Sequence, residues 1–351
     1  MNNKAEPLTP ETVMAALRKV QDPELKKDLV SLGMIKDLLI DGGKVTFTIE
    51  LTTPACPLKA KIKADARHAV EALDGVSEVE INLSSSVPSD GRISTVSQQM
   101  IRNAVAVASG KGGVGKTTVA VNVAVVLARL GARVGLMDAD IYGPNVPTMM
   151  GVDSMPGSTG EKLVPAEAYG VKLMSIGFLV QPGQPLIWRG PMLHSAISQF
   201  ITDVEWGKLD YLIVDLPPGT GDAQLSLAQL MPLSGSLIVT LPQKVSIEDA
   251  RRGLEMFRTL DVPILGVVEN MSYLELPDGD RMDIFGQGGG EKLAREAGVS
   301  FIGAIPLDPH VREGGDAGVP IVVSHPDSAV AKALTSIAQD LAAKVSIQAM
   351  R

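Results

Sequence analysis

The chain has 351 residues, of which 45% are hydrophobic, and it is long enough for about two globular domains. Its net charge of -8 and aromatic content of 3% argue against nucleic-acid binding, which needs a basic surface or stacking side chains. The one cysteine, Cys56, excludes an internal disulfide and fits a reducing compartment. The N-terminal residues lack the apolar core of a signal peptide, and no apolar run reaches the roughly 18 residues of a membrane span. We therefore expect a soluble, cytoplasmic protein that binds neither nucleic acid nor membranes.

Residues 8–83 are expected to form a small α+β domain. Thr9 is a suitable N-cap for its first helix, and Asp41-Gly42-Gly43 is a suitable hairpin turn. In chain order, the expected elements are a helix from Pro10 to about Val20, a β-hairpin over 38–51, a helix over 58–73 and a strand over 77–83.

Residues 84–101 are polar, contain proline and glycine, and show neither helical nor strand periodicity. This composition is typical of a flexible linker. We expect the small domain to move relative to the domain that follows.

From residue 102 onward, short apolar runs alternate with segments of helical pattern, and we assign residues 102–351 to one domain. The runs are continuous, which is typical of strands that are buried on both faces of a sheet. They fall at 104–108, 133–137, 211–214, 236–239 and 264–268. This order of elements predicts an α/β fold with a mainly parallel sheet flanked by helices.

The strongest motif is Gly-Lys-Gly-Gly-Val-Gly-Lys-Thr at 110–117, which fits the phosphate-loop pattern G-x-x-x-x-G-K-S/T. An expected strand (104–108) precedes it and an expected helix (118–130) follows it, as the motif requires. Glycines let backbone N–H groups turn toward phosphate oxygens, and the helix N-terminus adds positive potential. Lys116 would neutralise β- and γ-phosphate charge, and the Thr117 hydroxyl would bind Mg²⁺. The expected nucleotide-binding residues here are Gly110, Lys111, Gly112, Gly113, Val114, Gly115, Lys116, Thr117 and Thr118.

Two acidic segments follow expected strands and supply candidates for a magnesium site. Asp138 and Asp140 come directly after the strand at 133–137, and Asp215 follows the strand at 211–214. Ligands of open α/β sheets bind at the carboxyl ends of the strands, so these acids are expected to face the phosphates. We place Asp215 on the metal through water, and Asp138 and Asp140 either on the metal or on the attacking water. The expected Mg²⁺ ligands are Thr117, Asp138 and Asp215.

A minimal phosphate loop does not need Lys111, the second residue of the motif. Its position suits a lysine that reaches across a two-fold axis to a phosphate bound by a partner subunit. A cation supplied in this way stabilises the charge that develops on the transferring phosphoryl group. The alternative is a solvated loop lysine, and the residues alone leave both interpretations open.

Together these segments resemble the deviant-Walker P-loop ATPases that include MinD and ParA, and more narrowly the Mrp/ApbC iron–sulfur cluster carrier family. The resemblance covers nearly the whole chain. It rests on GKGGVGKTT at 110–118, DADIYGPN at 138–145, WRGPM at 188–192, DLPPGTGD at 215–222, ENMS at 269–272 and FGQGGGE at 285–291.

The resemblance implies ATP as the nucleotide, with Mg²⁺, and a homodimer in which Lys111 acts across the interface. Lys111, Lys116 and Asp140 form the implied catalytic set, with Asp140 positioning the hydrolytic water. The other implied sites are a γ-phosphate sensor at 219–222, an adenine contact from Asn270 and a base pocket lined by residues 305–307.

Residues 8–83 resemble the small domain of iron–sulfur and metallo-cofactor assembly proteins, through DPEL at 22–25, SLGMI at 31–35 and LTTPACPL at 51–58. Cys56 matches the cysteine of the last motif. It precedes an expected helix, whose dipole should lower the pKa of the thiol and favour a reactive thiolate or cluster ligand. A small buried hydrophobe is the alternative for a lone cysteine.

One departure from the family concerns the cysteines that bridge a cluster. Members that bridge one carry Cys-x-x-Cys between the Asn-Met-Ser-Tyr segment and Phe-Gly, and two such pairs supply the four thiolates of a 4Fe–4S cluster. Here residues 270–280 contain no cysteine, and a homodimer has only its two Cys56 thiols. An iron–sulfur cluster on this chain would need outside ligands such as glutathione or a partner's thiols.

Two functional hypotheses follow. The first is an ATP-hydrolysing iron–sulfur cluster carrier or assembly factor that works as a homodimer, with apo iron–sulfur proteins or an assembly scaffold as partners. The alternative is an ATP-dependent switch that docks a partner and holds no cluster. A MinD-like membrane cycler would need a basic amphipathic C-terminal helix. Residues 329–351 are instead rich in alanine and weakly charged, and we expect them to pack on the core.

Overall fold

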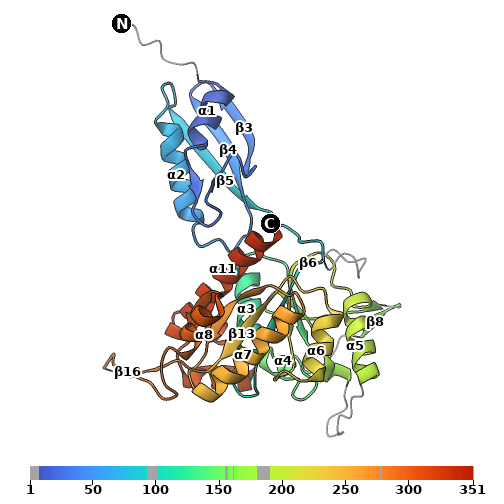
Figure 1. Ribbon diagram of the computed structural model, residues 1–351. Helices are drawn as coiled ribbons and strands as arrows, with labels where there is room; N and C mark the ends of the chain where they lie inside the picture. The colour runs from blue at the N-terminus through green and yellow to red at the C-terminus, as the bar shows by residue number, and fades with distance from the viewer. Residues whose placement is uncertain are drawn as a thin grey trace. The chain divides into compact units, whose positions relative to one another are not determined.

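The structure is a computed structural model and describes residues 8–92, 101–154, 157–160, 162–179, 190–276 and 278–350. The chain divides between Pro88 and Ser89 into two compact units (Figure 1). The expected linker, 84–101, includes this division, and its residues 93–100 lie outside the described residues. Its flexibility therefore stays a prediction.

Where it is described, the small unit contains two helices, a three-stranded sheet and a pair of two-residue strands. In chain order these are α1 (Pro10–Leu17), β1 (Gln21–Asp22), β2 (Lys27–Asp28), β3 (Ile35–Asp41), β4 (Lys44–Leu51), α2 (Lys59–Glu71) and β5 (Glu78–Ser85). Strands β3 and β4 form the expected antiparallel hairpin, and β5 pairs parallel to β4 on its other side.

Local sequence explains how α1 begins and how the hairpin turns. The Thr9 hydroxyl accepts a hydrogen bond from the Thr12 N–H, and the Thr12 hydroxyl accepts one from the Thr9 N–H. This reciprocal capping box satisfies two backbone donors at the helix start. Gly42 has a φ of 58°, a left-handed conformation that glycine adopts without strain, so Gly42-Gly43 closes the hairpin.

The core of the small unit lies between its sheet and its helices. Along β4, buried residues alternate with half-buried ones, so one face of the strand is apolar. That face packs against α1 and α2, and burial of each such side chain contributes about 1.5–3 kcal/mol. The central residues of this core are Val13, Leu17, Val45, Phe47, Ile49, Ile62, Ala66 and Val70.

The large unit is built on an eight-stranded sheet with the order β10-β11-β7-β12-β6-β13-β14-β17. Its strands are β6 (Ile101–Ser109), β7 (Val134–Asp138), β10 (Ala166–Ala168), β11 (Val171–Ser175), β12 (Leu209–Asp215), β13 (Gly235–Thr240), β14 (Ile264–Glu269) and β17 (Phe301–Ala304). All neighbours pair parallel except β10 and β11. The mainly parallel α/β fold and its five expected strands are confirmed, and β10, β11 and β17 are additional.

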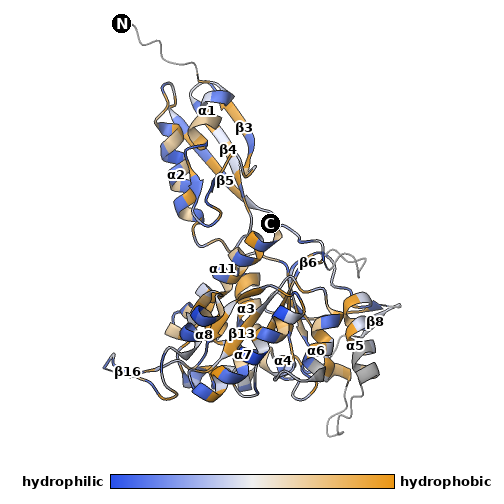
Figure 2. Ribbon diagram, viewed as in Figure 1, coloured by the Kyte–Doolittle hydropathy of each residue, from blue (hydrophilic) through white to orange (hydrophobic). Residues whose placement is uncertain are grey.

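Helices cover both faces of this sheet (Figure 1). On one face, α5 (Gly190–Thr202), α6 (Asp222–Leu230), α7 (Lys244–Thr259) and α8 (Gly289–Ala297) share a core with alternate residues of β6. On the other face, α3 (Lys116–Arg129) packs on β6, β7 and β12. Figure 2 shows mostly hydrophobic residues along α3 and β13, and mostly hydrophilic ones on the outer helix α7. The remaining elements of the large unit are α4 (Val146–Met149), β8 (Ser158–Thr159), β9 (Lys162–Leu163), η2 (Ile176–Leu179), β15 (Leu274–Glu275), β16 (Arg281–Met282), α9 (Pro309–Ala317), α10 (Ile321–Ser324) and α11 (Ala329–Ala349).

The C-terminal helix α11 packs against α3, as expected from its alanine-rich sequence. Its buried residues recur at helical spacing and include Leu334, Ile337, Leu341 and Val345. None of the helices within the described ranges combines the length and the apolar character that a bilayer crossing requires.

A buried carboxylate, Asp210, connects the start of β12 to the starts of β6 and β7. It is 6% exposed and accepts hydrogen bonds from the backbone and guanidinium of Arg133, the shortest at 2.7 Å, while Arg102 lies 3.7 Å away. Burial alone would raise the pKa of Asp210, but the hydrogen bonds and charge of Arg133 outweigh burial and lower it. The Asp210 carboxyl binds its proton more tightly in the unfolded chain than in the folded one. The Asp210–Arg133 pair therefore stabilises the fold above the unfolded pKa of about 3.9, and this stabilisation is lost as the pH falls through the folded pKa.

Asp210→Asn should lower the free energy of unfolding by about 1–2 kcal/mol near neutral pH, because Arg133 loses a charged acceptor in a pair that solvent partly screens. The difference from wild type should persist near pH 5 and narrow below about pH 4, because the carboxyl takes up its proton first in the unfolded chain and only at lower pH in the folded one. Urea denaturation across this range measures it, with the exposed Asp153→Asn as the charge-matched control. A difference that does not change with pH would contradict the assigned role of the charge.

Candidate functional site

The candidate phosphate loop connects β6 to α3 at the carboxyl edge of the sheet. Gly113 and Gly115 have φ values of 79° and 83°, in the left-handed region that favours glycine. Gly115 is also closely packed, because a Cβ there would lie 2.1 Å from Nδ2 of Asn270. The motif therefore needs glycine at this position for both conformation and space.

Backbone N–H groups of this loop are available to an anion. Helix α3 begins at Lys116, and its N-cap Gly115 has no side chain to cap it. Within the part of the chain that the structure describes, no protein acceptor takes a hydrogen bond from the N–H groups of residues 111–118. Unpaired N–H groups at a helix start, together with the helix dipole, form a site suited to phosphate.

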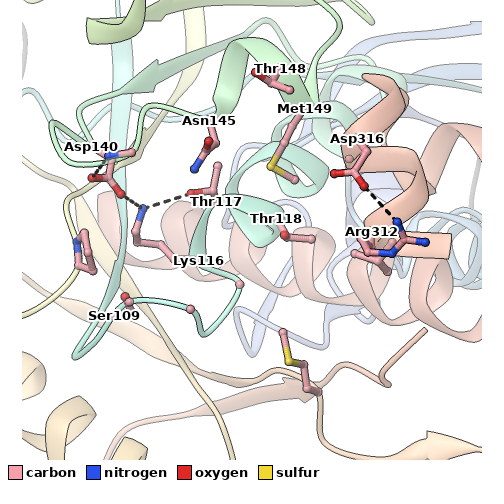
Figure 3. Close-up of a pocket in the computed structure, with 18 of the residues that line it drawn as sticks. Ser109, Lys116, Thr117, Thr118, Asp140, Asn145, Thr148, Met149, Arg312 and Asp316 are labelled. Atoms are coloured by element: carbon pink, nitrogen blue, oxygen red, sulfur yellow. Dashed lines mark hydrogen bonds and ion pairs between the residues drawn. The ribbon is translucent and has the colours of Figure 1, made fainter. Parts of the chain in front are cut away.

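Lys116 lies at the centre of a polar cluster at one end of this site (Figure 3). Its Nζ donates to Oδ1 of Asp215 at 2.8 Å, and it lies 3.4 Å from Oδ2 of Asp140 and 3.4 Å from Oγ1 of Thr117. The Thr117 hydroxyl donates to the other oxygen of Asp215 at 2.7 Å. The structure thus brings together four of the residues singled out in the sequence, from α3 and from the ends of β7 and β12.

Carboxyl groups outnumber basic groups in this cluster. Burial raises the pKa of Asp215, and the ammonium of Lys116 opposes that effect. Burial, followed by the charge of Asp215, raises the pKa of Asp138 to about 7. One lysine does not balance the charge that Asp138, Asp140 and Asp215 would carry when all are ionised, so a divalent cation fits the cluster. Its hydroxyl and carboxylate oxygens are also the hard ligands that Mg²⁺ prefers.

Asp138 is part of the cluster, but its oxygens are already used within the protein. Oδ1 accepts from the Asp140 N–H at 3.1 Å, and Oδ2 accepts from the Val146 N–H at 3.2 Å and the Ser175 hydroxyl at 2.8 Å. These contacts connect both ends of the 138–146 loop to the end of β11. In this structure Asp138 holds the loop that carries Asp140, and its role as a Mg²⁺ ligand stays a prediction.

A cavity of about 620 Å³ opens over the loop, within the usual size of small-molecule sites. Lys116 and Asp140 line one end of it (Figure 3), and Lys111 is also among its lining residues. The other end is lined by residues of α4 and α9 that the sequence motifs did not indicate. They are Thr148, Met149, Val311, Arg312, Gly315 and Asp316. The only sequence signal for the α9 face is its spacing of three or four residues, which many surface helices share.

Of the residues expected around the base, some line the cavity and others are buried beside it. Asn270 is buried and donates from Nδ2 to the carbonyl of Val114 at 2.8 Å, so its contact with adenine stays a prediction. Of residues 305–307, Leu307 lines the cavity, whereas Ile305 is buried. Met271, which the sequence did not indicate, also lines the cavity and has a φ of 50°. Left-handed backbone at a residue with a side chain is a strain that is found at ligand sites.

The expected γ-phosphate sensor, 219–222, lies between β12 and α6. The Gly219 N–H donates to the carbonyl of Ser109 at 2.9 Å, which joins this segment to the end of β6. The preceding residue, Pro218, lines the cavity. The segment is therefore next to the phosphate loop, and its sensing role stays a prediction.

In the small unit, the expected lowering of the Cys56 pKa is wrong, and the reactivity of the thiol stays a prediction. The thiol lies in the apolar core and is 5% exposed. Burial is the largest effect on it and raises its pKa, and the charges of Glu24 and Asp22 add to the increase, against a hydrogen bond from the Leu58 backbone. Helix α2 begins at Lys59, and the effects at its start that lower the pKa, the Leu58 backbone hydrogen bond and the charge of Lys59, are outweighed by burial. Whether Cys56 binds a cluster stays a prediction.

Two family models match the chain. A model described as the NUBPL iron-transfer P-loop NTPase matches residues 100–342, and a model of an iron–sulfur cluster assembly protein matches residues 10–82. Together they cover most of the large and small units.

Whole-chain relatives and solved structures agree with these models. The iron–sulfur cluster carrier protein of Synechocystis sp. is 56% identical over 98% of this chain and 99% of its own, and that of Deinococcus radiodurans is 49% identical over 97% of each. A nucleotide-binding protein from Archaeoglobus fulgidus, solved in complex with ADP, is 38% identical with a TM-score of 0.57, over 66% of this chain and 91% of its own. The cell division ATPase MinD of Pyrococcus furiosus, 24% identical with a TM-score of 0.52 over 68% of this chain and 97% of its own, shares the fold.

Replacing Gly115 by alanine should destabilise the protein more than replacing Gly113. Both changes force a residue with a Cβ into the left-handed region, at about 1–2 kcal/mol each. Only at Gly115 does the new Cβ meet Asn270, since nothing lies within 4 Å of it at Gly113. In urea denaturation without nucleotide, Gly115→Ala should therefore lower the free energy of unfolding by about 1–3 kcal/mol more than Gly113→Ala does. Equal losses of unfolding free energy in the two variants would contradict the role assigned to the close packing of Gly115 against Asn270.

Proposed function

This chain belongs to the NUBPL family of iron-transfer P-loop NTPases, and we propose that it hydrolyses ATP as a homodimer to carry iron–sulfur clusters to apo-proteins. Its proposed partners are a second copy of the chain and apo iron–sulfur proteins or an assembly scaffold. Its proposed location is the cytoplasm, where thiols stay reduced. The observation that supports ATP hydrolysis is the convergence of Lys116, Thr117, Asp140 and Asp215 at one cavity.

The charges at the phosphate end suit a triphosphate. Lys116 exchanges its bonds to Asp215 and Asp140 for β- and γ-phosphate oxygens, and the unpaired N–H groups of the loop donate to the same phosphates. Mg²⁺, when bound, neutralises phosphate charge, and the Thr117 hydroxyl and Asp215 carboxylate would hold it together with phosphate oxygens and water. Once Lys116 is released, Asp140 is left to interact with water.

Two further residues are proposed to carry hydrolysis. Asp140 orients the attacking water, and its carboxylate is fixed because Oδ1 accepts from the backbone N–H groups of Tyr142 and Gly143. Lys111 lines the cavity and has no ion-pair partner among the residues that are described. It is therefore available to reach the nucleotide of the partner subunit, where it stabilises the transferring phosphoryl group.

The number and burial of the cysteines favour a second candidate function. A bridging 4Fe–4S cluster needs four thiolates, whereas a homodimer of this chain has two cysteines, each buried in its small unit. Cluster carriage would therefore need outside thiols and exposure of Cys56. The second candidate is an ATP-dependent switch that docks a partner and holds no cluster.

Lys111→Ala should leave ATP binding largely intact and slow turnover by about 10³-fold or more, as the loss of a cation supplied in trans does. Lys116→Ala should abolish binding, because the phosphates lose their central cation. A fluorescent ATP analogue measures binding, and phosphate release measures turnover. Mixing the two variants should restore part of the activity, because the mixed dimer keeps one site with Lys116 in place and Lys111 from the other subunit. Undiminished turnover of Lys111→Ala, or a mixture that stays inactive although mixed dimers form, would contradict the role in trans.

Anaerobic reconstitution with iron, sulfide and glutathione separates the two candidate functions. The carrier predicts a visible absorbance band and transfer of the cluster to an apo-acceptor, both lost in Cys56→Ser. Cys56→Ala, which keeps an apolar group in the core, controls for unfolding and should lose the cluster equally. If the wild type takes up no cluster, the carrier is excluded and the partner-docking switch remains.

A further inference from the structure

A buried carboxylate, Glu269, lies beside the nucleotide site and has no role in the mechanism above. It ends β14 and is 1% exposed. Its Oε1 accepts from the Ser272 hydroxyl at 2.5 Å, and its Oε2 accepts from the Gly290 N–H at 2.6 Å. A Cβ on Gly290 would lie 3.0 Å from the Cβ of Glu269, so glycine permits this close approach. A carboxylate this deeply buried is tolerated because both of its oxygens have donors.

These two hydrogen bonds hold both ends of one segment, residues 273–288, in which Pro277 lies outside the described residues. Ser272 precedes the segment and Gly290 follows it at the start of α8. Between them, β15 and β16 form a hairpin, and β16 lies away from the sheet in Figure 1. Met282 and Ile284 of this segment are 49% and 44% exposed. A single buried side chain thus fixes the base of an exposed loop.

The same end of β14 is also joined to the phosphate loop. Asn270, next to Glu269, donates to the carbonyl of Val114 within the loop, at 2.8 Å. Met271 lines the cavity, as does Leu307, whose N–H donates to the carbonyl of Tyr273 at 2.7 Å. The nucleotide site and the 273–288 segment are therefore connected through consecutive residues of one short stretch of chain.

We infer that Glu269 is a positioning residue that holds Asn270 and Met271 at the nucleotide site and makes the 273–288 segment respond to nucleotide. When the N–H groups of the phosphate loop bind phosphates, the loop fixes the Val114 carbonyl and, with it, Asn270. Because Glu269 holds both ends of the segment next to Asn270, ordering of the loop stabilises the base of the segment. The inference rests on the proposed ATP binding and names the surface that would report the nucleotide state to a partner.

Hydrogen exchange of the full chain, with and without Mg²⁺ and ATP, tests this inference. In the wild type, saturating ATP should slow exchange in 273–288 by a factor of roughly 5 to 150, the usual range for coupled sites. In Glu269→Ala, exchange should be fast in both states, so that its dependence on ATP is lost. Glu269→Gln has the same shape and keeps an acceptor for the Gly290 N–H, so it should restore the dependence. Glu275→Ala removes an exposed carboxylate from the same segment and should behave as wild type.

Calorimetry on each sample establishes whether ATP is bound, which separates this inference from the proposed function. ATP binding without any change of exchange in wild-type 273–288 overturns the inference and leaves the proposed function intact, whereas no ATP binding at all overturns both. A Glu269→Ala variant that folds, binds ATP and still slows exchange in 273–288 on binding ATP, as wild type does, also overturns the inference. A purely structural role of Glu269 would change exchange equally with and without ATP. If Glu269→Ala does not fold, Ser272→Ala decides the question by the same measurement: the dependence should shrink, and an unchanged dependence overturns the inference.

Discussion

The candidate site depends on β6 and β12 being parallel neighbours in the sheet. Their register pairs Val107 with Asp215, so the carboxylate ends beside the loop that follows Ser109. The result is a buried ion pair between Lys116 and Asp215 at 2.8 Å. Removal of one partner from such a pair typically costs about 3–5 kcal/mol, because the other charge is left buried and unpaired. The pair therefore supports the fold and also occupies the lysine that phosphates need.

In the proposed function, nucleotide binding at this site is an exchange of partners. Lys116 would leave Asp215 and Asp140 for phosphate oxygens, and those two carboxylates would then need another positive charge. A divalent cation that arrives with the nucleotide would supply it, in keeping with the excess of acids over bases in the cluster. Asp138 contributes differently, since its hydrogen bonds to the Asp140 N–H, the Val146 N–H and the Ser175 hydroxyl hold the neighbouring loop in place.

Features set by local sequence were predicted well. Continuous apolar runs indicated the five central strands because both faces of these strands are buried, and the glycine pattern indicated the phosphate loop because its backbone geometry requires glycine. Strand β17 (Phe301–Ala304) was missed because it is short and lies at the edge of the sheet. The α9 side of the cavity was missed because no motif marks it, and Met271 because its role depends on a backbone conformation that the sequence does not show. The pKa of Cys56 was predicted wrongly because a local rule, the helix dipole, was outweighed by burial in the core.

At two positions, Asn270 and Cys56, the structure adds contacts that the family resemblance does not indicate. The resemblance assigns Asn270 to the base, which stays a prediction, and in the structure its amide donates to the carbonyl of Val114, which connects the phosphate loop to β14. Cys56 is the chain's only cysteine and lies in the core of the small unit, away from solvent. The candidate nucleotide site is assembled from residues in contact, whereas the proposed cluster carriage would need thiols from outside the chain.

The most direct measurement is isothermal titration calorimetry of the folded, full-length chain with ATP in the presence of Mg²⁺. We expect a heat of association that saturates at one nucleotide per chain and weakens when Mg²⁺ is removed. A folded protein that gives no heat of association with ATP would contradict the assignment of the loop, the lysine and the acids to a nucleotide site.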